Sequence, residues 1–150
     1  MNSTRFFRNK EIWPHIVVLL ACSGILAGTW LLTPPDERGG TIQLFGISLP
    51  NVCSFRRHTG LPCPGCGLTR SLTEIMHGRI SKGFDYHSLG LPTLVYIMFQ
   101  TIYRGAWLAF PRRRKILEGW GFYLNRAFIY LAILYGLNWI HRLLGTIAVF

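Results

Sequence analysis

The sequence predicts an all-α membrane protein with three transmembrane helices and one amphipathic interfacial helix that follows a Cys-containing loop. Apolar residues make up 50% of the 150 residues and charged residues 15%, whereas soluble domains carry about 25% charged residues. The basic residues give a formal net charge of +10 and lie at the ends of apolar segments. This placement indicates contact with the membrane surface. We therefore expect a single membrane domain over residues 1–150, with membrane lipids and no nucleic acid among its partners.

The first predicted span covers about residues 13–32, which contain no Lys, Arg, Asp or Glu. A helix needs ~20 such residues to cross a bilayer. Trp13 and Trp30 lie near its two ends, as interfacial aromatic residues do. The stretch is longer than the ~7–15 apolar residues of a signal peptide, which favours a retained helix over a cleaved one.

The second predicted span covers about residues 88–110 and the third about residues 119–144. Arg104 is the charge inside the second span, and Arg126 lies inside the third. A charge within a membrane helix is by default a candidate functional group, so Arg126 is predicted as a binding residue. Snorkelling of its side chain to lipid phosphate is the simpler alternative.

Two basic segments predict the orientation of these spans. Arg5, Arg8 and Lys10 precede the first span, and Arg112–Lys115 connects the second to the third. Short segments rich in Lys and Arg stay in the cytoplasm, and three spans place both on the same side. The N-terminus is then cytoplasmic, and the loop of residues 33–87 is external.

The external loop contains two predicted elements. Residues 41–49 are compatible with a short strand or hairpin. Residues 68–82 show the apolar spacing of a helix, with a capping box at Ser71-x-x-Glu74 or a start marked by Gly67. The apolar face of this helix either lies at the membrane surface or packs on the spans.

Three cysteines of the loop, Cys53, Cys63 and Cys66, allow three kinds of site. Cys53 can form a structural disulfide with Cys63 or Cys66. The three thiolates can instead hold zinc, with His77 or alternatively His58 as the fourth ligand. Cys63 and Cys66 form a C-x-x-C unit before a helix, which suits a redox pair with Cys53 as the resolving thiol.

The segment Cys63-Pro-Gly-Cys66-Gly-Leu-Thr-Arg70 resembles a widespread bacterial family of small integral membrane proteins with a CPxCGxTR motif and unknown function. Members tend to carry a Cys about ten residues upstream, which Cys53 matches. The family often has Asn-Pro before the next span, where this chain has Tyr86-His87-Ser88-Leu89. The resemblance implies a multi-pass protein of the bacterial inner (plasma) membrane and does not imply an activity.

Two motif residues, Thr69 and Arg70, are predicted binding residues. Arg70 can bind a lipid phosphate or another anion, or pair with Glu74 four residues later. The sequence contains no Gly-x-Ser-x-Gly, HExxH, phosphate loop or paired carboxylates, so whether it is an enzyme stays open.

The first functional hypothesis is a non-enzymatic membrane component. Its Cys-clamped loop and interfacial helix would dock a lipid, another membrane protein or a second copy of the chain. The alternatives are a membrane thiol–disulfide oxidoreductase using Cys63 and Cys66, and a zinc-stabilised membrane scaffold.

Overall fold

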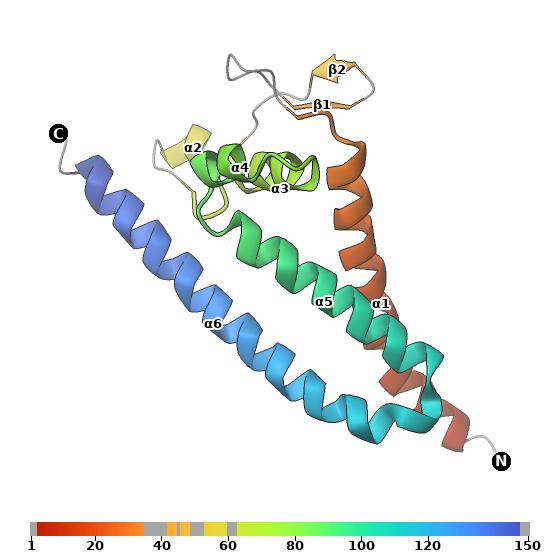
Figure 1. The fold of residues 1–150 in the computed structure, drawn as a ribbon. Coiled ribbons are helices and arrows are strands. Elements are labelled where there is room, and N and C mark those ends of the chain that lie inside the picture. The colour runs from red at the N-terminus through yellow and green to blue at the C-terminus, as the bar shows by residue number, and fades with distance from the viewer. Residues whose placement is uncertain (1–2, 35–41, 45, 49–52, 60–62, 148–150) are drawn as a thin grey trace.

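The computed structural model describes residues 3–34, 42–44, 46–48, 53–59 and 63–147 of the chain. This part of the chain is mostly helical (Figure 1). Three long helices, α1 (Ser3–Leu31), α5 (Gly90–Ala109) and α6 (Arg114–Ile147), run side by side, with α5 packed against both others. The shorter elements are β1 (Gln43–Leu44), β2 (Ile47–Ser48), α2 (Ser54–Thr59), α3 (Leu68–Met76), α4 (Ile80–Tyr86) and the 3-10 helix η1 (Pro111–Arg113).

Two segments of the described chain are long and apolar enough to cross a membrane. They are Ile12–Leu31 in α1 and Pro111–Gly145 in η1 and α6, which confirms that the first and third predicted spans are helices of this kind. Helix α5 has 20 residues, the length of a span, and contains Gln100 and Arg104, but it is not one of these two segments. The passage of α5 through a membrane therefore stays a prediction.

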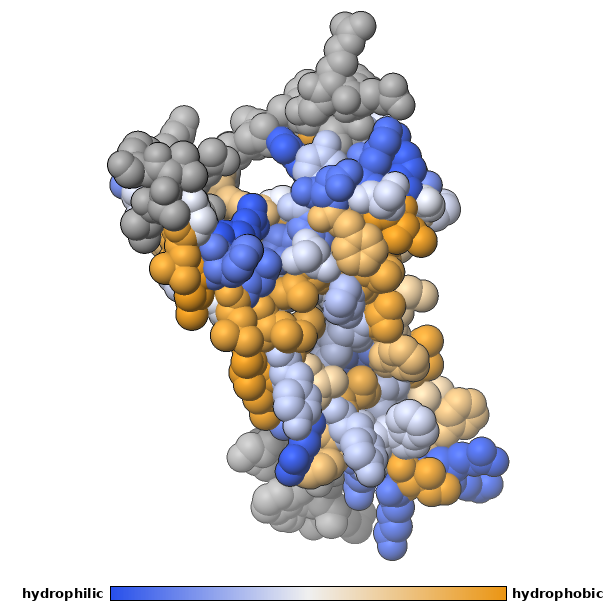
Figure 2. Space-filling view, turned by 60° about the vertical axis from the view of Figure 1, so that its left-hand side comes forward, coloured by the Kyte–Doolittle hydropathy of each residue, from blue (hydrophilic) through white to orange (hydrophobic). Residues whose placement is uncertain are grey.

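The basic segments and the cysteine segment lie at opposite ends of the helix assembly (Figure 1). The start of α1 lies at the same end of the assembly as the turn from α5 to α6, whereas α6 ends at the end that carries α2. Strongly hydrophilic side chains gather toward the two ends, and hydrophobic side chains concentrate over the part between them (Figure 2). This distribution follows the polarity profile of a membrane, with an apolar centre and two polar surfaces.

The predicted helix of residues 68–82 is two helices, α3 and α4, which corrects the continuous helix inferred from the apolar spacing. The break has a local cause, because Gly78 has a φ of 80° and ends α3 in a left-handed conformation that glycine tolerates best. The apolar face of α3 packs on the long helices, where Leu72 and Ile75 form a buried cluster with Leu94 of α5. The sequence allows two positions for this apolar face, the membrane surface and the long helices. The structure shows it packed on the long helices.

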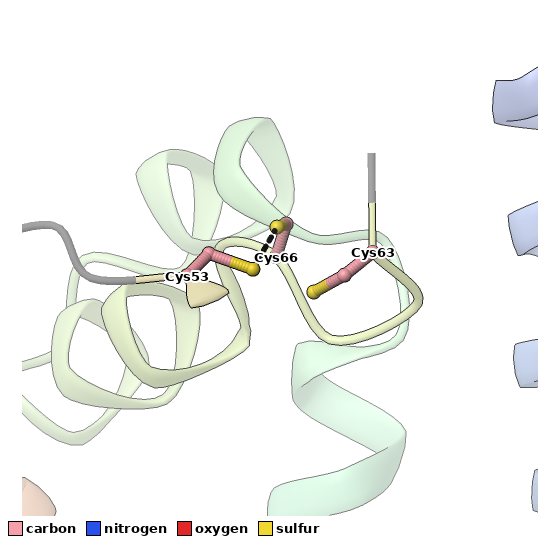
Figure 3. A group of neighbouring side chains, drawn as sticks. All are labelled: Cys53, Cys63 and Cys66. Atoms are coloured by element: carbon pink, nitrogen blue, oxygen red, sulfur yellow. Dashed lines mark hydrogen bonds between the residues drawn. The ribbon is translucent and has the colours of Figure 1, made fainter. Parts of the chain in front are cut away.

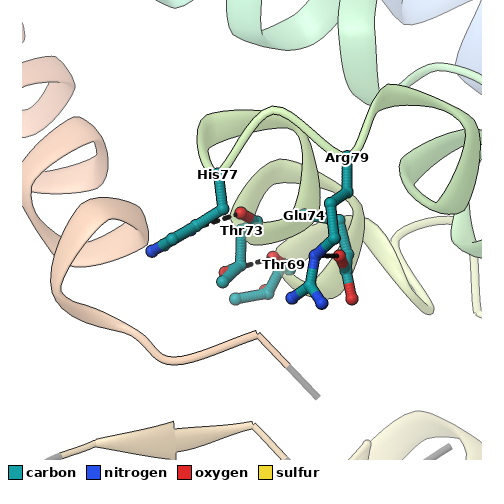
Figure 4. Close-up of polar contacts among 5 residues, drawn as sticks. All are labelled: Thr69, Thr73, Glu74, His77 and Arg79. Atoms are coloured by element: carbon teal, nitrogen blue, oxygen red, sulfur yellow. Dashed lines mark hydrogen bonds and ion pairs between the residues drawn. The ribbon is translucent and has the colours of Figure 1, made fainter. Parts of the chain in front are cut away.

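Of the two starts considered for α3, the one marked by Gly67 is observed and the capping box is not. The helix begins at Leu68 after Gly67, and Ser71 is fully buried in its second turn instead of capping it. Ser71 Oγ donates to the carbonyl of Gly83 at 2.6 Å, because α4 approaches α3 closely enough to offer that carbonyl. The ion pair of Glu74 is with Arg79 at 2.7 Å rather than with Arg70, since the turn at Gly78 brings Arg79 back over α3 (Figure 4).

The hairpin predicted near residues 41–49 is present in the described residues. Strands β1 and β2 pair antiparallel, with Gln43 opposite Ser48, whereas positions 41, 45 and 49 lie outside the described residues. Thr33, just after α1, donates its N–H to the carbonyl of Gln43 at 2.8 Å. The hairpin is therefore attached directly to the end of α1.

Candidate metal centre

Three cysteine side chains converge at the end of the molecule that carries α2 and α3 (Figure 3). The Sγ atoms of Cys53, Cys63 and Cys66 all lie within 4.8 Å of one another. Cys66 Sγ and Cys53 Sγ are 3.4 Å apart. All three side chains are half-buried, and they point toward a common centre.

The backbone of the Cys63–Cys66 turn positions two of these sulfur atoms. The N–H of Cys66 donates to the carbonyl of Cys63 at 3.2 Å, and the N–H of Leu68 donates to Gly65 at 3.0 Å. The chain then enters α3, so both sulfur atoms lie at the start of a helix. Cys53 comes from the other side, directly before α2. The group therefore joins two segments of the chain.

Gly67 explains why a glycine follows the second cysteine of the motif. Its φ of 91° lies in the left-handed region, which costs other residues free energy. A Cβ atom at this position would lie 2.5 Å from the carbonyl oxygen of Tyr86, at the end of α4. The turn thus needs a residue without a side chain for both its conformation and its packing.

His87 holds the same turn from α4. Its ring is buried, and Nε2 donates to the carbonyl of Pro64 at 3.0 Å. Nδ1 accepts from the N–H of Leu89 at 3.2 Å, so the ring is the neutral tautomer with its proton on Nε2. Burial lowers the pKa of His87 below its ordinary value, and the charge of Arg142 lowers this pKa further.

Helix α6 also contacts this end of the molecule through polar side chains. Arg142 Nη1 donates to the carbonyl of Cys66 at 3.3 Å, and Asn138 Oδ1 accepts from Ser88 Oγ at 3.3 Å. The ring of Tyr135 lies beside the ring of His87. The hydroxyl oxygen of Tyr135 is 2.8 Å from Thr93 Oγ1, a hydrogen-bond distance.

Two features were not identified from the sequence: His87, and the row of polar side chains on α6 formed by Tyr135, Asn138 and Arg142. The signal for the row was present, because positions 135, 138 and 142 follow helical spacing inside an otherwise apolar segment. His87 gave no comparable signal, because its partners are backbone groups at Pro64 and Leu89.

The electrostatics of the thiols bear on what the group can bind. Burial raises the pKa of Cys63 to about 12, and hydrogen bonds with Cys66 and Cys53 act in the same direction. Without a cation, this thiol is therefore protonated at neutral pH. A bound Zn²⁺ reverses that preference, because a coordinating thiol is deprotonated outright. Zn–S bonds of about 2.3 Å in a tetrahedron separate the sulfur atoms by about 3.8 Å, so small movements of these side chains would fit the ion.

The two predicted histidine ligands lie apart from this group. Within the described residues, the cluster contains three cysteines and no histidine. His77 lies at the end of α3, where Nδ1 donates to the carbonyl of Thr73 at 2.8 Å (Figure 4). Its ring stacks near Trp30 with centroids 5.9 Å apart. His58 is exposed on α2.

The other predicted binding residues lie on two helices, α3 and α6. Thr69 is exposed on α3, and its carbonyl accepts from Thr73 Oγ1 at 2.9 Å. Arg70 lies over the ring of Tyr86, with its guanidinium carbon 5.7 Å from the ring centroid. Arg126 is exposed on α6 and lies over Phe122 at 4.7 Å. The structure does not bring these three residues into one site, and their binding roles stay predictions.

Comparison with known families identifies one match. Residues 53–101 match a family described as "Protein of unknown function (DUF2752)". The matched segment includes the three clustered cysteines, so the expected resemblance to a family of unknown function is confirmed over these residues. Comparison with curated proteins and with solved structures gave no match.

Proposed function

We propose that this chain is a non-enzymatic component of the bacterial inner membrane, in which a zinc ion held by Cys53, Cys63 and Cys66 fixes the cysteine loop as a docking surface. The observation that carries the proposal is the convergence of three Sγ atoms within 4.8 Å of one another. Thiolates are the preferred ligands of structural zinc sites, which usually have four ligands. Water or a residue of a docked partner supplies the fourth position.

The membrane arrangement in this proposal has three spans, with the N-terminus in the cytoplasm and the cysteine loop outside. Two helices long and apolar enough to cross a membrane support it, together with α5, which lies between them. The position of the start of α1 and the α5–α6 turn at the same end of the assembly also supports it (Figure 1). Basic segments on the same side satisfy the preference for cytoplasmic Lys and Arg.

The docking surface lies on the short helices beside the cysteine group. Phe55 of α2 is 40% exposed, and Ile80 and Phe84 of α4 are 48% and 44% exposed. These apolar side chains suit contact with a lipid, with another membrane protein or with a second copy of the chain. The cysteine group would hold α2 against the start of α3, and so keep these side chains in a fixed arrangement.

A thiol–disulfide oxidoreductase is the second candidate, and the 3.4 Å approach of Cys53 Sγ to Cys66 Sγ favours it. In that reaction a thiolate of the Cys63/Cys66 pair would attack a substrate disulfide, forming a mixed disulfide and releasing one substrate thiolate. A second thiolate of the group, with Cys53 as the resolving candidate, would then attack the mixed disulfide, so that the second substrate thiolate leaves and the protein keeps a disulfide. The raised pKa of Cys63, about 12, disfavours this role, because the thiolate is the nucleophile in such exchange. Zinc binding therefore ranks first.

The test combines elemental analysis with thiol counting on protein purified in detergent without reductant. We expect one zinc ion per chain, and protection of three thiols from alkylation until a chelator is added. Cys53→Ser, Cys63→Ser and Cys66→Ser should each lose most of the zinc. Cys22→Ser is the matched control, because Cys22 lies in α1 outside the group and should leave zinc binding unchanged. Zinc-free protein with a readily reducible Cys63 disulfide would reject the scaffold in favour of the oxidoreductase.

A further inference from the structure

A second cluster of functional side chains lies where α1, α5 and α6 meet, at the end opposite the cysteines. The ring of His15 stacks on Trp107, with centroids 3.7 Å apart and planes 6° from parallel. The guanidinium carbon of Arg114 lies 4.0 Å from the Trp107 centroid. Arg104 Nη1 lies 2.9 Å from His15 Nδ1. Two guanidinium groups from different helices therefore surround one aromatic pair.

Among the side chains that the structure describes, no ion pair joins Arg104 or Arg114 to a carboxylate. The ion pair in the described part of the chain is Arg79 with Glu74, on α3 and the turn that follows it. Arg104 contacts His15 and Gln100, the latter at 3.4 Å, and neither contact supplies a negative charge. Arg114 Nε is buried and has no hydrogen-bond partner. A buried guanidinium N–H without an acceptor is costly, so this position favours a bound anion.

We infer that Arg104 and Arg114 bind the phosphate group of an anionic phospholipid, an inference that rests on the membrane placement proposed above. Guanidinium groups bind phosphate through several charge-assisted hydrogen bonds. The aromatic pair of His15 and Trp107 holds both cations in place and limits the entropy lost on binding.

The surroundings favour a lipid over free phosphate. Ile102 of α5 and Phe110, which directly follows this helix, are 65% and 58% exposed, so acyl chains can lie beside the charged cluster. Trp13 and Trp120 are 68% and 61% exposed near the same end, where interfacial tryptophans are expected. A ligand with a phosphate head and an apolar body fits both features. Free inorganic phosphate matches the charge alone.

The test measures lipid binding to the full chain in neutral detergent by native mass spectrometry, with thermal unfolding as a second readout. Phosphatidylglycerol, phosphatidylcholine and inorganic phosphate are compared at equal concentrations. We expect phosphatidylglycerol to bind at least about fivefold better than phosphatidylcholine and to raise Tm, with no effect of inorganic phosphate. Stabilisation by inorganic phosphate equal to that by phosphatidylglycerol would reject the lipid as the source of the phosphate group.

The variant Arg104→Gln/Arg114→Gln should reduce phosphatidylglycerol binding to the level of phosphatidylcholine. Arg112→Gln/Arg113→Gln is the matched control, because it removes two exposed charges from the same connection and should retain most of the preference. An equal loss in the two variants would mean general attraction by a basic surface and would overturn the site. If the first variant fails to fold, Arg114→Lys provides the test. It keeps the charge but loses the planar donor group, and should weaken binding partially.

Two further readouts separate this inference from the proposed function. The variant Arg104→Gln/Arg114→Gln should keep its zinc and resist extraction from membranes by alkaline carbonate. A wild-type chain that carbonate extracts would overturn both proposals, because neither docking in a membrane nor lipid binding at its surface would remain. A retained chain that binds the two lipids equally would overturn the lipid site alone.

Discussion

The polar groups at the two ends of the molecule make different kinds of contact. At the cysteine end, Ser71, His87 and Arg142 all bond to backbone carbonyls, and Gly67 lets two helices approach each other closely. At the basic end, arginines stack on aromatic rings. Cation–π contacts tolerate changes of geometry better than hydrogen bonds to fixed carbonyls do. The cysteine end is thus a defined three-dimensional arrangement, whereas the basic end is a charged surface held by stacking.

This difference has a consequence for stability. Substitutions at the cysteine end should remove partners from buried groups or create clashes, and both effects are large. Substitutions at the basic end should change charge while leaving the helix packing intact. The four predictions below test this contrast from the largest expected effect to the smallest.

Gly67→Ala should destabilise the protein by about 2–4 kcal/mol and lower its zinc content. The new Cβ atom would meet the carbonyl of Tyr86 and would force alanine into a left-handed conformation. Thermal unfolding in detergent measures the effect. Gly65→Ala is the control, because a Cβ at Gly65 meets nothing within 4 Å. Equal stability of the two variants would show that the turn is not constrained as described.

Ser71→Ala should cost about 1–3 kcal/mol, because Ser71 is fully buried and its hydroxyl donates to the carbonyl of Gly83. The same hydroxyl lies 3.3 Å from the carbonyl of His87. The exposed Ser81→Ala serves as the control and should change Tm little. A Ser71→Ala variant as stable as the wild type would mean that water replaces the lost hydroxyl.

Acidification should destabilise the cysteine end through His87. Its folded-state pKa is lowered, so its contribution is complete above the ordinary histidine pKa of about 6.5 and declines as the pH falls below that value. Protonation also removes the acceptor at Nδ1 for Leu89.

The measurement is Tm between pH 7.5 and 5.5 for the wild type and His87→Gln. The His87→Gln variant should have a lower Tm than the wild type at pH 7.5, and its Tm should fall less on acidification. His58→Gln, at an exposed position, should follow the wild type. A parallel decline in all three proteins would assign the pH effect to other groups, the thiols included.

His15→Phe should have the smallest effect, below about 1 kcal/mol, because phenylalanine keeps the stack on Trp107 and loses the contact with Arg104. His15→Ala loses both and should be the less stable variant by thermal unfolding. If His15→Phe proves as damaging as Ser71→Ala, the contrast between the two ends fails.

The long helices could be predicted from the sequence because length and apolar composition alone determine them. The clustering of the three cysteines could also be predicted, since a disulfide, a zinc site and a redox pair all require these thiols to lie close together. The break at Gly78 could not, because the apolar spacing continues across it into α4. The ion-pair partner of Glu74 could not be predicted for the same reason, because the turn brings Arg79 over the carboxylate.

The histidine ligands show a different limit of the sequence. His77 is close to the cysteines along the chain, but α3 carries it toward α1 and Trp30. Each residue of a helix adds a rise of about 1.5 Å along its axis. The ten residues or so between Cys66 and His77 therefore separate the two side chains by more than either can reach. His87 is further along the chain and nevertheless contacts Pro64, because the chain turns back between α3 and α4.

The cysteine group also closes a loop in the chain. Cys53 and Cys66 are 13 positions apart in the sequence, and their sulfur atoms lie 3.4 Å apart. A cation shared by both would act as a removable crosslink, whose stabilisation depends on the free metal concentration rather than on packing alone. The cluster of Leu72, Ile75 and Leu94 lies outside this loop. With such a cation, metal supply would control the order of one surface segment while the helices beneath it stay assembled, and that surface would respond to the chemistry of its surroundings.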